Sequence, residues 1–182
     1  MLLGTGPGVA IHRDALERYI RDQKPLVLAL NTQSAIDPDL IDLRVACHPV
    51  RLLADCDAHT RLPQPLITPF SMLPEVVQAS LADKEVLDFG LKVQTGKFEF
   101  SETYCTTPTS LVMAYAFAIA ASGECRSLYL AGFDGYPGED PRNTEMNLIV
   151  KQFQSSSAEL PLIAITPSRY DVDKISIYGL VK

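Results

Sequence analysis

The sequence lacks the features that would place it at a membrane or on a nucleic acid. Its longest apolar run, Leu111 to Ala121, is too short to span a bilayer and is typical of a buried helix. A net charge of −6 with no local basic patch disfavours nucleic acid and anionic lipid as partners. Because no signal peptide stands at the amino terminus, we expect a cytoplasmic protein.

The sequence also lacks the spacing of a metal site. The four cysteines, Cys47, Cys56, Cys105 and Cys125, include no C-x-x-C pair, which indicates free thiols in a reducing compartment. Cys105 precedes an expected helix start, where the helix dipole would favour a thiolate, but no base partner for a nucleophile is identified. No H-x-H pair or carboxylate cluster predicts a resident metal.

What the sequence does contain is a glycine-rich stretch at its start, from Gly4 to Gly8, with an amphipathic helix pattern over Val9 to Asp22 behind it. Glycines let a ligand approach the main chain, and a helix amino terminus attracts anions. A tight turn that only closes a strand–helix corner explains the same pattern, and both interpretations stay open. The candidate ligand-binding residues here are Gly4, Thr5, Gly6, Pro7 and Gly8.

Two common nucleotide motifs do not fit this loop. The dinucleotide fingerprint requires a third glycine where this chain has Val9, and an acidic residue at the end of the second strand where it has Asn31. A Walker A loop requires Gly-Lys-Ser/Thr after the glycines, where Gly8 is followed by Val9 and Ala10. A looser phosphate or ribose-phosphate loop remains, which leaves nucleotide and nucleotide-sugar ligands open.

Short apolar strands alternate with helix patterns along the whole chain. The expected strands after the first loop are Pro25 to Asn31, Leu43 to His48, Gln64 to Pro69, Glu85 to Gly90, Leu128 to Ala131 and Pro161 to Ile165. The expected helices after the first are Pro49 to His59, Ser71 to Leu81, Ser110 to Ser122 and Asn143 to Ser156, and a single helical turn is expected at Asp37 to Ile41. Ser71 is expected to cap the second of these helices. The third is expected to start near Thr106 or Thr107, before Pro108. This alternation predicts an α/β, Rossmann-like, doubly wound and mostly parallel sheet with helices on both faces. A small hairpin insertion is expected at Lys92 to Phe100.

The length and composition predict a single Rossmann-like domain over residues 1–182. Met1 to Leu3 provide too little chain for a central strand. We therefore expect a domain excised from a longer chain.

In a doubly wound sheet, ligands bind beyond the carboxyl ends of the strands. That rule selects Asn31, His48, Thr68 and the turn from Gly132 to Tyr136, in addition to the glycine loop. The predicted catalytic residues are Asp134, which could reach a ribose hydroxyl, a divalent metal or an acceptor hydroxyl, and His48 as a general base.

Further ligand-binding candidates are Asn31, Gly132, Tyr136 and Arg169, the last as a phosphate contact from the tail. Each has a structural alternative that stays open: a capping aspartate, a local hydrogen-bonding histidine, an Asx turn, a packed tyrosine or a solvated arginine. His12 and His59 fall on helix patterns and are expected to face solvent or pack.

The order of glycine loop, Asn-ending second strand and Gly132-Phe133-Asp134 turn resembles a Rossmann-like group at the motif level. That group includes bacterial sialyltransferases with a CMP-sugar donor and pterin diphosphokinase-like proteins. The resemblance implies that the loop and Asn31 contact a nucleotide, with Asp134 and Tyr136 near its phosphate or ribose. The chain departs from the sialyltransferases in having no counterpart of their catalytic histidine near the carboxyl terminus.

A second resemblance covers nearly the whole chain. Four runs carry it: Ala46 to Asp55 (ACHPVRLLAD), Pro65 to Pro69 (PLITP), Leu130 to Tyr136 (LAGFDGY) and Ile165 to Tyr170 (ITPSRY). They are similar to the carboxyl-terminal domain of aldolases related to hydroxymethylglutaryl-CoA lyase, which are associated with lipopolysaccharide and O-antigen biosynthesis. The resemblance implies an upstream aldolase barrel that holds the metal-binding histidines of the lyase centre.

These observations lead to one expected function and two alternatives. The expected function is a nucleotide- or nucleotide-sugar-binding domain of an aldolase-type protein in bacterial surface polysaccharide synthesis. The alternatives are a glycosyl or phosphoryl transferase of the sialyltransferase-like type and a non-catalytic interaction domain of the aldolase. No cofactor is identified, and a nucleotide, a CMP-sugar, a divalent metal and a homo-oligomer all stay open.

Overall fold

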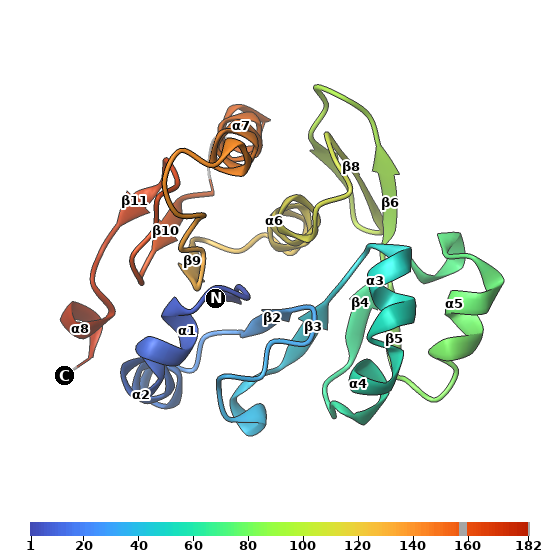
Figure 1. The fold of residues 1–182 in the computed structure, drawn as a ribbon, viewed down its shortest axis with the longest axis horizontal. Coiled ribbons are helices and arrows are strands. Elements are labelled where there is room, and N and C mark those ends of the chain that lie inside the picture. The colour runs from blue at the N-terminus through green and yellow to red at the C-terminus, as the bar shows by residue number, and fades with distance from the viewer. Residues whose placement is uncertain (157–159, 182) are drawn as a thin grey trace.

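The computed structural model, which describes residues 1–156 and 160–181, contains an eight-stranded sheet in which every pair of neighbouring strands is parallel (Figure 1). In spatial order, its strands are β11 (Asp173–Lys174), β10 (Leu162–Ala164), β9 (Leu128–Ala131), β1 (Leu2–Leu3), β2 (Leu28–Leu30), β3 (Leu43–Val45), β4 (Leu66–Thr68) and β5 (Val86–Asp88). The predicted α/β, Rossmann-like class is confirmed. Although β1 has only two residues, it is a central strand, with β2 on one side and β9 on the other.

Helices cover both faces of this sheet, as a doubly wound fold requires. On one face lie α6 (Val112–Ser122) and α7 (Pro141–Ser156). On the other lie α1 (Gly8–Ile11), α2 (Arg13–Gln23), α3 (Pro49–Ala54), α4 (Cys56–Arg61), α5 (Glu75–Ser80) and α8 (Ile177–Leu180). The strand β1 shows the division directly, since Leu2 packs into the core of the first face and its neighbour Leu3 into that of the second.

The helix α6 is the buried central helix that its sequence predicts. Residues 113–118 are all buried, and alanine alternates there with large side chains, so the helix can approach the sheet closely. It begins at Val112, later than the predicted start near Thr106 or Thr107, because those threonines lie in a strand. In the described part of the chain, no helix is both long and apolar enough to cross a bilayer.

The predicted hairpin insertion is wrong in its pairing. The insertion is a three-stranded sheet in the order β6 (Gly90–Val93), β8 (Tyr104–Thr107) and β7 (Glu99–Phe100). The strand β8 lies between the two predicted hairpin strands, parallel to β6 and antiparallel to β7. The turn-like Thr95-Gly96 therefore does not join neighbouring strands, and the missed strand β8 supplies the buried centre of this small sheet.

Three predicted helices are divided or shortened. The predicted helix from Val9 to Asp22 breaks at His12, and the one from Pro49 to His59 breaks at Asp55. Ser71 is not a helix cap, because it lies inside the 3-10 helix η2 (Phe70–Met72) and α5 starts only after Pro74. The single turn predicted near Asp37 is the 3-10 helix η1 (Pro38–Leu40), and Asp37 does cap it.

Candidate functional site

The strand order places a switch point between β1 and β9. From β1 the chain moves to β2, β3, β4 and β5 on one side, and then returns across the sheet to β9 on the other side. The chain leaves β1 and β9 toward helices on opposite faces of the sheet, α1 and α7, and doubly wound sheets bind ligands at such a point.

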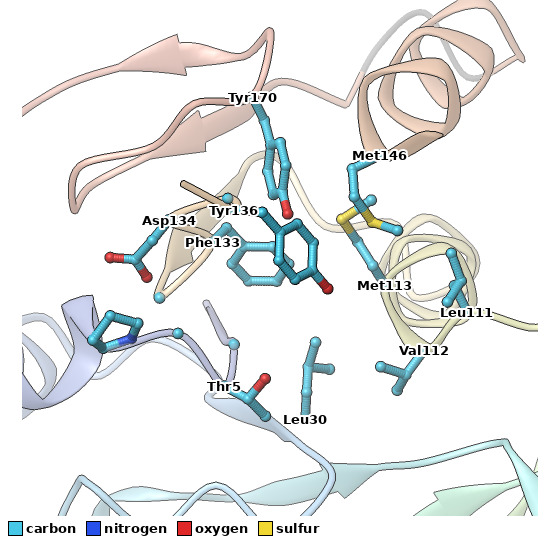
Figure 2. Close-up of a pocket in the computed structure, with 15 residues that line it drawn as sticks. Thr5, Leu30, Leu111, Val112, Met113, Phe133, Asp134, Tyr136, Met146 and Tyr170 are labelled. Atoms are coloured by element: carbon cyan, nitrogen blue, oxygen red, sulfur yellow. The ribbon is translucent and has the colours of Figure 1, made fainter. Parts of the chain in front are cut away.

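A cavity of about 370 Å³ lies at this point. Figure 2 shows its walls: Leu30 from the end of β2, Val112 and Met113 from α6, and Tyr136 from the loop after β9. The complete lining is Gly4, Thr5, Gly6, Pro7, Leu30, Leu111, Val112, Met113, Gly132, Phe133, Asp134, Gly135, Tyr136, Met146 and Tyr170. The cavity thus combines an apolar wall with the two loops that the sequence singles out.

The glycine loop and the Asp134 turn are hydrogen-bonded to each other. The amide of Gly4 donates to the Ala131 carbonyl at 2.8 Å, and that of Gly6 donates to the Gly132 carbonyl at 3.0 Å. Further on, the amide of Gly8 donates to the carboxylate of Asp134 at 3.2 Å. Two segments far apart in the sequence therefore form one unit at the sheet edge.

This pairing explains why glycine is needed at two of these positions. A Cβ atom on Gly6 would overlap the Asp134 carboxylate and lie 2.6 Å from the Gly132 carbonyl oxygen. Gly132 itself has a φ of 73°, a conformation that side chains rarely adopt, and a Cβ there would overlap Val9. The glycines are thus required by the close approach of the two loops, before any ligand is considered.

The Asp134 turn is fixed from the carboxyl-terminal side as well. The hydroxyl of Ser168 donates to the Phe133 carbonyl at 2.6 Å, and the amide of Arg169 donates to the Asp134 carbonyl at 3.1 Å. The side chain of Asn143 both accepts from the amide and donates to the carbonyl of Tyr136, each at 2.8 Å. The position of Asp134 is therefore determined by two segments besides the glycine loop.

Aromatic rings form the outer wall of the cavity. The Arg142 guanidinium lies 3.7 Å from the centre of the Tyr136 ring and also pairs with Asp140, which holds the pKa of that carboxyl below its usual range. Tyr170 is buried, and burial, with Tyr136 and Asp134 nearby, raises the pKa of its hydroxyl to about 12. Figure 2 shows the Tyr136 hydroxyl directed into the cavity.

A buried arginine supports the glycine loop indirectly. Arg44 has no exposed surface, and its guanidinium donates to the carbonyl of Gln33 at 2.7 Å and to that of Asn31 at 3.3 Å. The amide group of Gln33 in turn donates to the Gly4 carbonyl. No carboxylate pairs with Arg44 among the described residues, and burial lowers its pKa to about 10. Gln33 was not singled out from the sequence, since nothing in the local pattern shows which loop it contacts.

The cavity brings together most of the predicted site residues. Its walls include Gly4, Thr5, Gly6, Pro7, Gly132, Asp134 and Tyr136. Gly8 lies just outside, bonded to Asp134, and Asn31, which has a left-handed backbone conformation with a φ of 52°, is not among the lining residues. His48 is exposed at the start of α3 and does not line the cavity, although β3 ends at the expected edge. Arg169 lines a neighbouring hollow.

The residues that sequence reasoning missed are the apolar ones. Leu30, Leu111, Val112 and Met113 line the cavity, but each lies in an apolar run that the sequence assigns equally well to the core. Met146 lies in a helix pattern that carries no other signal, whereas Phe133 belongs to the turn that the sequence selected. Cys105, considered as a nucleophile, is buried in β8 away from any helix start, and burial raises its pKa to about 12. In the part of the chain that the structure describes, no three His, Cys, Asp or Glu side chains are grouped to hold a metal ion.

Comparison with protein-family models, curated proteins and solved structures finds no match to this chain.

Proposed function

We propose that this chain is a nucleotide- or nucleotide-sugar-binding domain and that its ligand occupies the cavity lined by the loops after β1 and β9. The observation that carries the proposal is the position of that cavity at the switch point of a doubly wound parallel sheet. Its volume of about 370 Å³ lies within the range of small-molecule sites, at roughly 300 to 1,000 Å³.

The chemistry of the lining supports this ligand class. Leu30 and Val112 present apolar surface on which a base can lie, and the Tyr136 ring is close enough to stack on one (Figure 2). The Thr5 hydroxyl points toward the cavity in the same view. The backbone amides of Thr5 and Gly135 donate to no acceptor in the described part of the chain, so both are free for a ligand.

The biological setting in the proposal comes from the resemblance to lyase-related aldolases. On that basis, the domain works beside an upstream aldolase domain in bacterial lipopolysaccharide synthesis, in the cytoplasm. The ligand is then a nucleotide or an activated sugar of that process.

A transferase is a second candidate, favoured by the position of Asp134 beside the cavity. In that role its carboxylate would take a proton from an acceptor hydroxyl. The Asp134 carboxylate is bonded to the Gly8 amide, so it would have to turn away from the loop to reach a substrate. A non-catalytic interaction domain is a third candidate, favoured by the glycine loop's own contacts, which suffice for a structural turn.

Titration calorimetry with CMP, a CMP-sugar, a UDP-sugar and ATP tests the proposal. We expect one of these to bind, and we expect Val112→Phe to abolish binding because the larger ring fills the cavity. Val93→Phe is the matched control, since Val93 is exposed in β6, away from the cavity. Failure of all four ligands to bind at millimolar concentration, or full retention of affinity by Val112→Phe, would contradict the proposal. Turnover of donor that disappears in Asp134→Asn would show the transferase.

A further inference from the structure

The cavity walls contain no cation. Among the residues that line it, only Asp134, Tyr136 and Tyr170 can ionise, and none of these carries a positive charge. A phosphate placed in the cavity would therefore find no positive charge in the walls to offset its own charge.

The glycine loop does not supply the missing positive charge. The Gly8 amide already donates to Asp134 and the Gly6 amide to the Gly132 carbonyl, and Pro7 has no amide hydrogen. The Thr5 amide is free, but a single peptide N–H carries only a partial positive charge. The helix behind the loop, α1, has only four residues and thus a small dipole. The anion held at this loop is a side chain of the chain itself.

Positive charge lies on the other side of Asp134. A second hollow, of about 400 Å³, is lined by Asp134, Gly135, Pro137, Pro167, Ser168 and Arg169. It shares Asp134 and Gly135 with the cavity, so the two are neighbours along the sheet edge. An apolar, aromatic wall and a cationic one therefore lie on either side of Asp134 and Gly135.

The cation of this second hollow is unpaired and its backbone is held in place. Arg169 forms no ion pair with the described residues and its side chain is exposed. Its amide is bonded to the Asp134 carbonyl, which fixes the start of the side chain beside the turn. Arg142, the other arginine nearby, is already paired with Asp140 and stacked on Tyr136. Arg169 is thus the group best placed for an anion.

We propose that the ligand lies across Gly135, with its uncharged ring and sugar in the cavity beside Tyr136 and its anionic group, a phosphate, against Arg169. This orientation is the opposite of the one that a glycine loop suggests by itself, in which the phosphate lies on the loop. It rests on the proposed function, because it assigns the two ends of the same nucleotide ligand.

The test compares nucleosides with their monophosphates by titration calorimetry at 50 mM salt. The probes are cytidine and CMP, uridine and UMP, and adenosine and AMP. For the pair that binds, we expect the monophosphate to bind more tightly than the nucleoside. Arg169→Ala should lower the affinity for the monophosphate about tenfold, to that of the nucleoside, and leave the nucleoside affinity unchanged.

Arg126→Ala is the matched control, because Arg126 is exposed and precedes β9, at the opposite edge of the sheet. Arg169→Gln keeps a polar side chain and should behave as Arg169→Ala does. Equal loss of nucleoside and monophosphate affinity, no loss of either, or the same loss in Arg126→Ala would overturn the orientation while the proposed function stands. If no nucleoside or nucleotide binds, the proposed function fails.

Discussion

The carboxylate of Asp134 accepts a hydrogen bond from the backbone amide of Gly8 at 3.2 Å, across 126 positions of sequence. The bond joins the loop after β1 to the loop after β9, the two strands that flank the switch point. Because Asp134 fills the position that a ligand's phosphate would take in a phosphate loop, the glycine stretch acts here as one wall of a cavity. The carboxylate can accept this hydrogen bond because Gly8 has no Cβ atom to occupy the same space.

Replacing Gly8 by alanine should therefore act through Asp134. All three atoms nearest to the new Cβ belong to that side chain, the closest being Oδ1 at 2.6 Å. We expect Gly8→Ala to displace the carboxylate and lower the free energy of unfolding by about 1 kcal/mol, the usual net value of a hydrogen bond. In an Asp134→Ala background, the same change should cost nothing.

Urea unfolding of the two single variants and the double variant measures this coupling. Gly179→Ala serves as the control, since a Cβ there meets no atom within 4 Å and should leave stability nearly unchanged. Additive effects of Gly8→Ala and Asp134→Ala would contradict the proposed contact.

Gln33 should contribute to the shape of the glycine loop through its amide group. In Gln33→Glu the side chain keeps the oxygen that accepts from the Ala35 amide, but loses the N–H that donates to the Gly4 carbonyl. We expect a loss of about 1 to 2 kcal/mol in stability, because a carboxylate then faces a carbonyl oxygen. Thermal unfolding measures it, with Gln94→Glu as the control, since the Gln94 side chain makes no hydrogen bond in the described part of the chain. Equal melting temperatures for Gln33→Glu and wild type would show that the bond is unimportant.

The sequence predicts the large sheet well and the small one poorly. Runs such as Leu128 to Ala131 are apolar at every position, which identifies strands buried on both faces of a parallel sheet. The strand Tyr104–Thr107 was missed because its threonines, standing before Pro108, also fit a helix start, and only tertiary pairing with β6 decides between the two. The local sequence pattern likewise does not show the order of the strands in space, so it cannot show that β8 lies between β6 and β7.

For the site, the sequence singles out residue types that stand out from the apolar core pattern, namely the glycines of the two loops and the aspartate of the second. Gly6 was identified as part of a glycine loop that a ligand can approach, and Gly132 and Asp134 because their turn follows the end of an expected strand. The identity of the partner that the loop binds was not predictable, because the Asp134 side chain and a phosphate satisfy a glycine loop's amide in the same way. Leu30 and Val112 were not identified because core and cavity walls use the same residue types.

The four cysteines should differ in their reaction with a thiol reagent. Cys47 and Cys105 are buried, and burial raises the pKa of each thiol to about 12, so both should resist iodoacetamide at pH 8. Cys56 and Cys125 are partly exposed and should be modified first. Mass spectrometry after brief alkylation should find at most two modified thiols in the native protein and four in urea. Rapid modification of Cys105 in the native protein would restore the nucleophile hypothesis.

His59 should make stability depend on pH between about 4 and 6.5. Its side chain is buried in α4, and burial lowers its pKa to about 4, with the positive charges of Arg44 and Lys84 opposing protonation and Asp55 favouring it. The unfolded chain takes up the proton near its ordinary pKa of about 6.5, whereas the folded chain does so only near 4. Between these values the unfolded state binds more protons, so stability is full above about pH 6.5 and falls as the pH drops toward 4.

We expect the free energy of unfolding to decrease by about 2 kcal/mol from pH 7 to pH 4.5 through this residue, measured as the difference between wild type and His59→Gln. The subtraction removes the titration of the carboxylates, which is common to both proteins. If wild type and His59→Gln keep a constant difference in stability over this range, His59 does not titrate on unfolding, and its burial beside Arg44 does not have the cost assigned to it here.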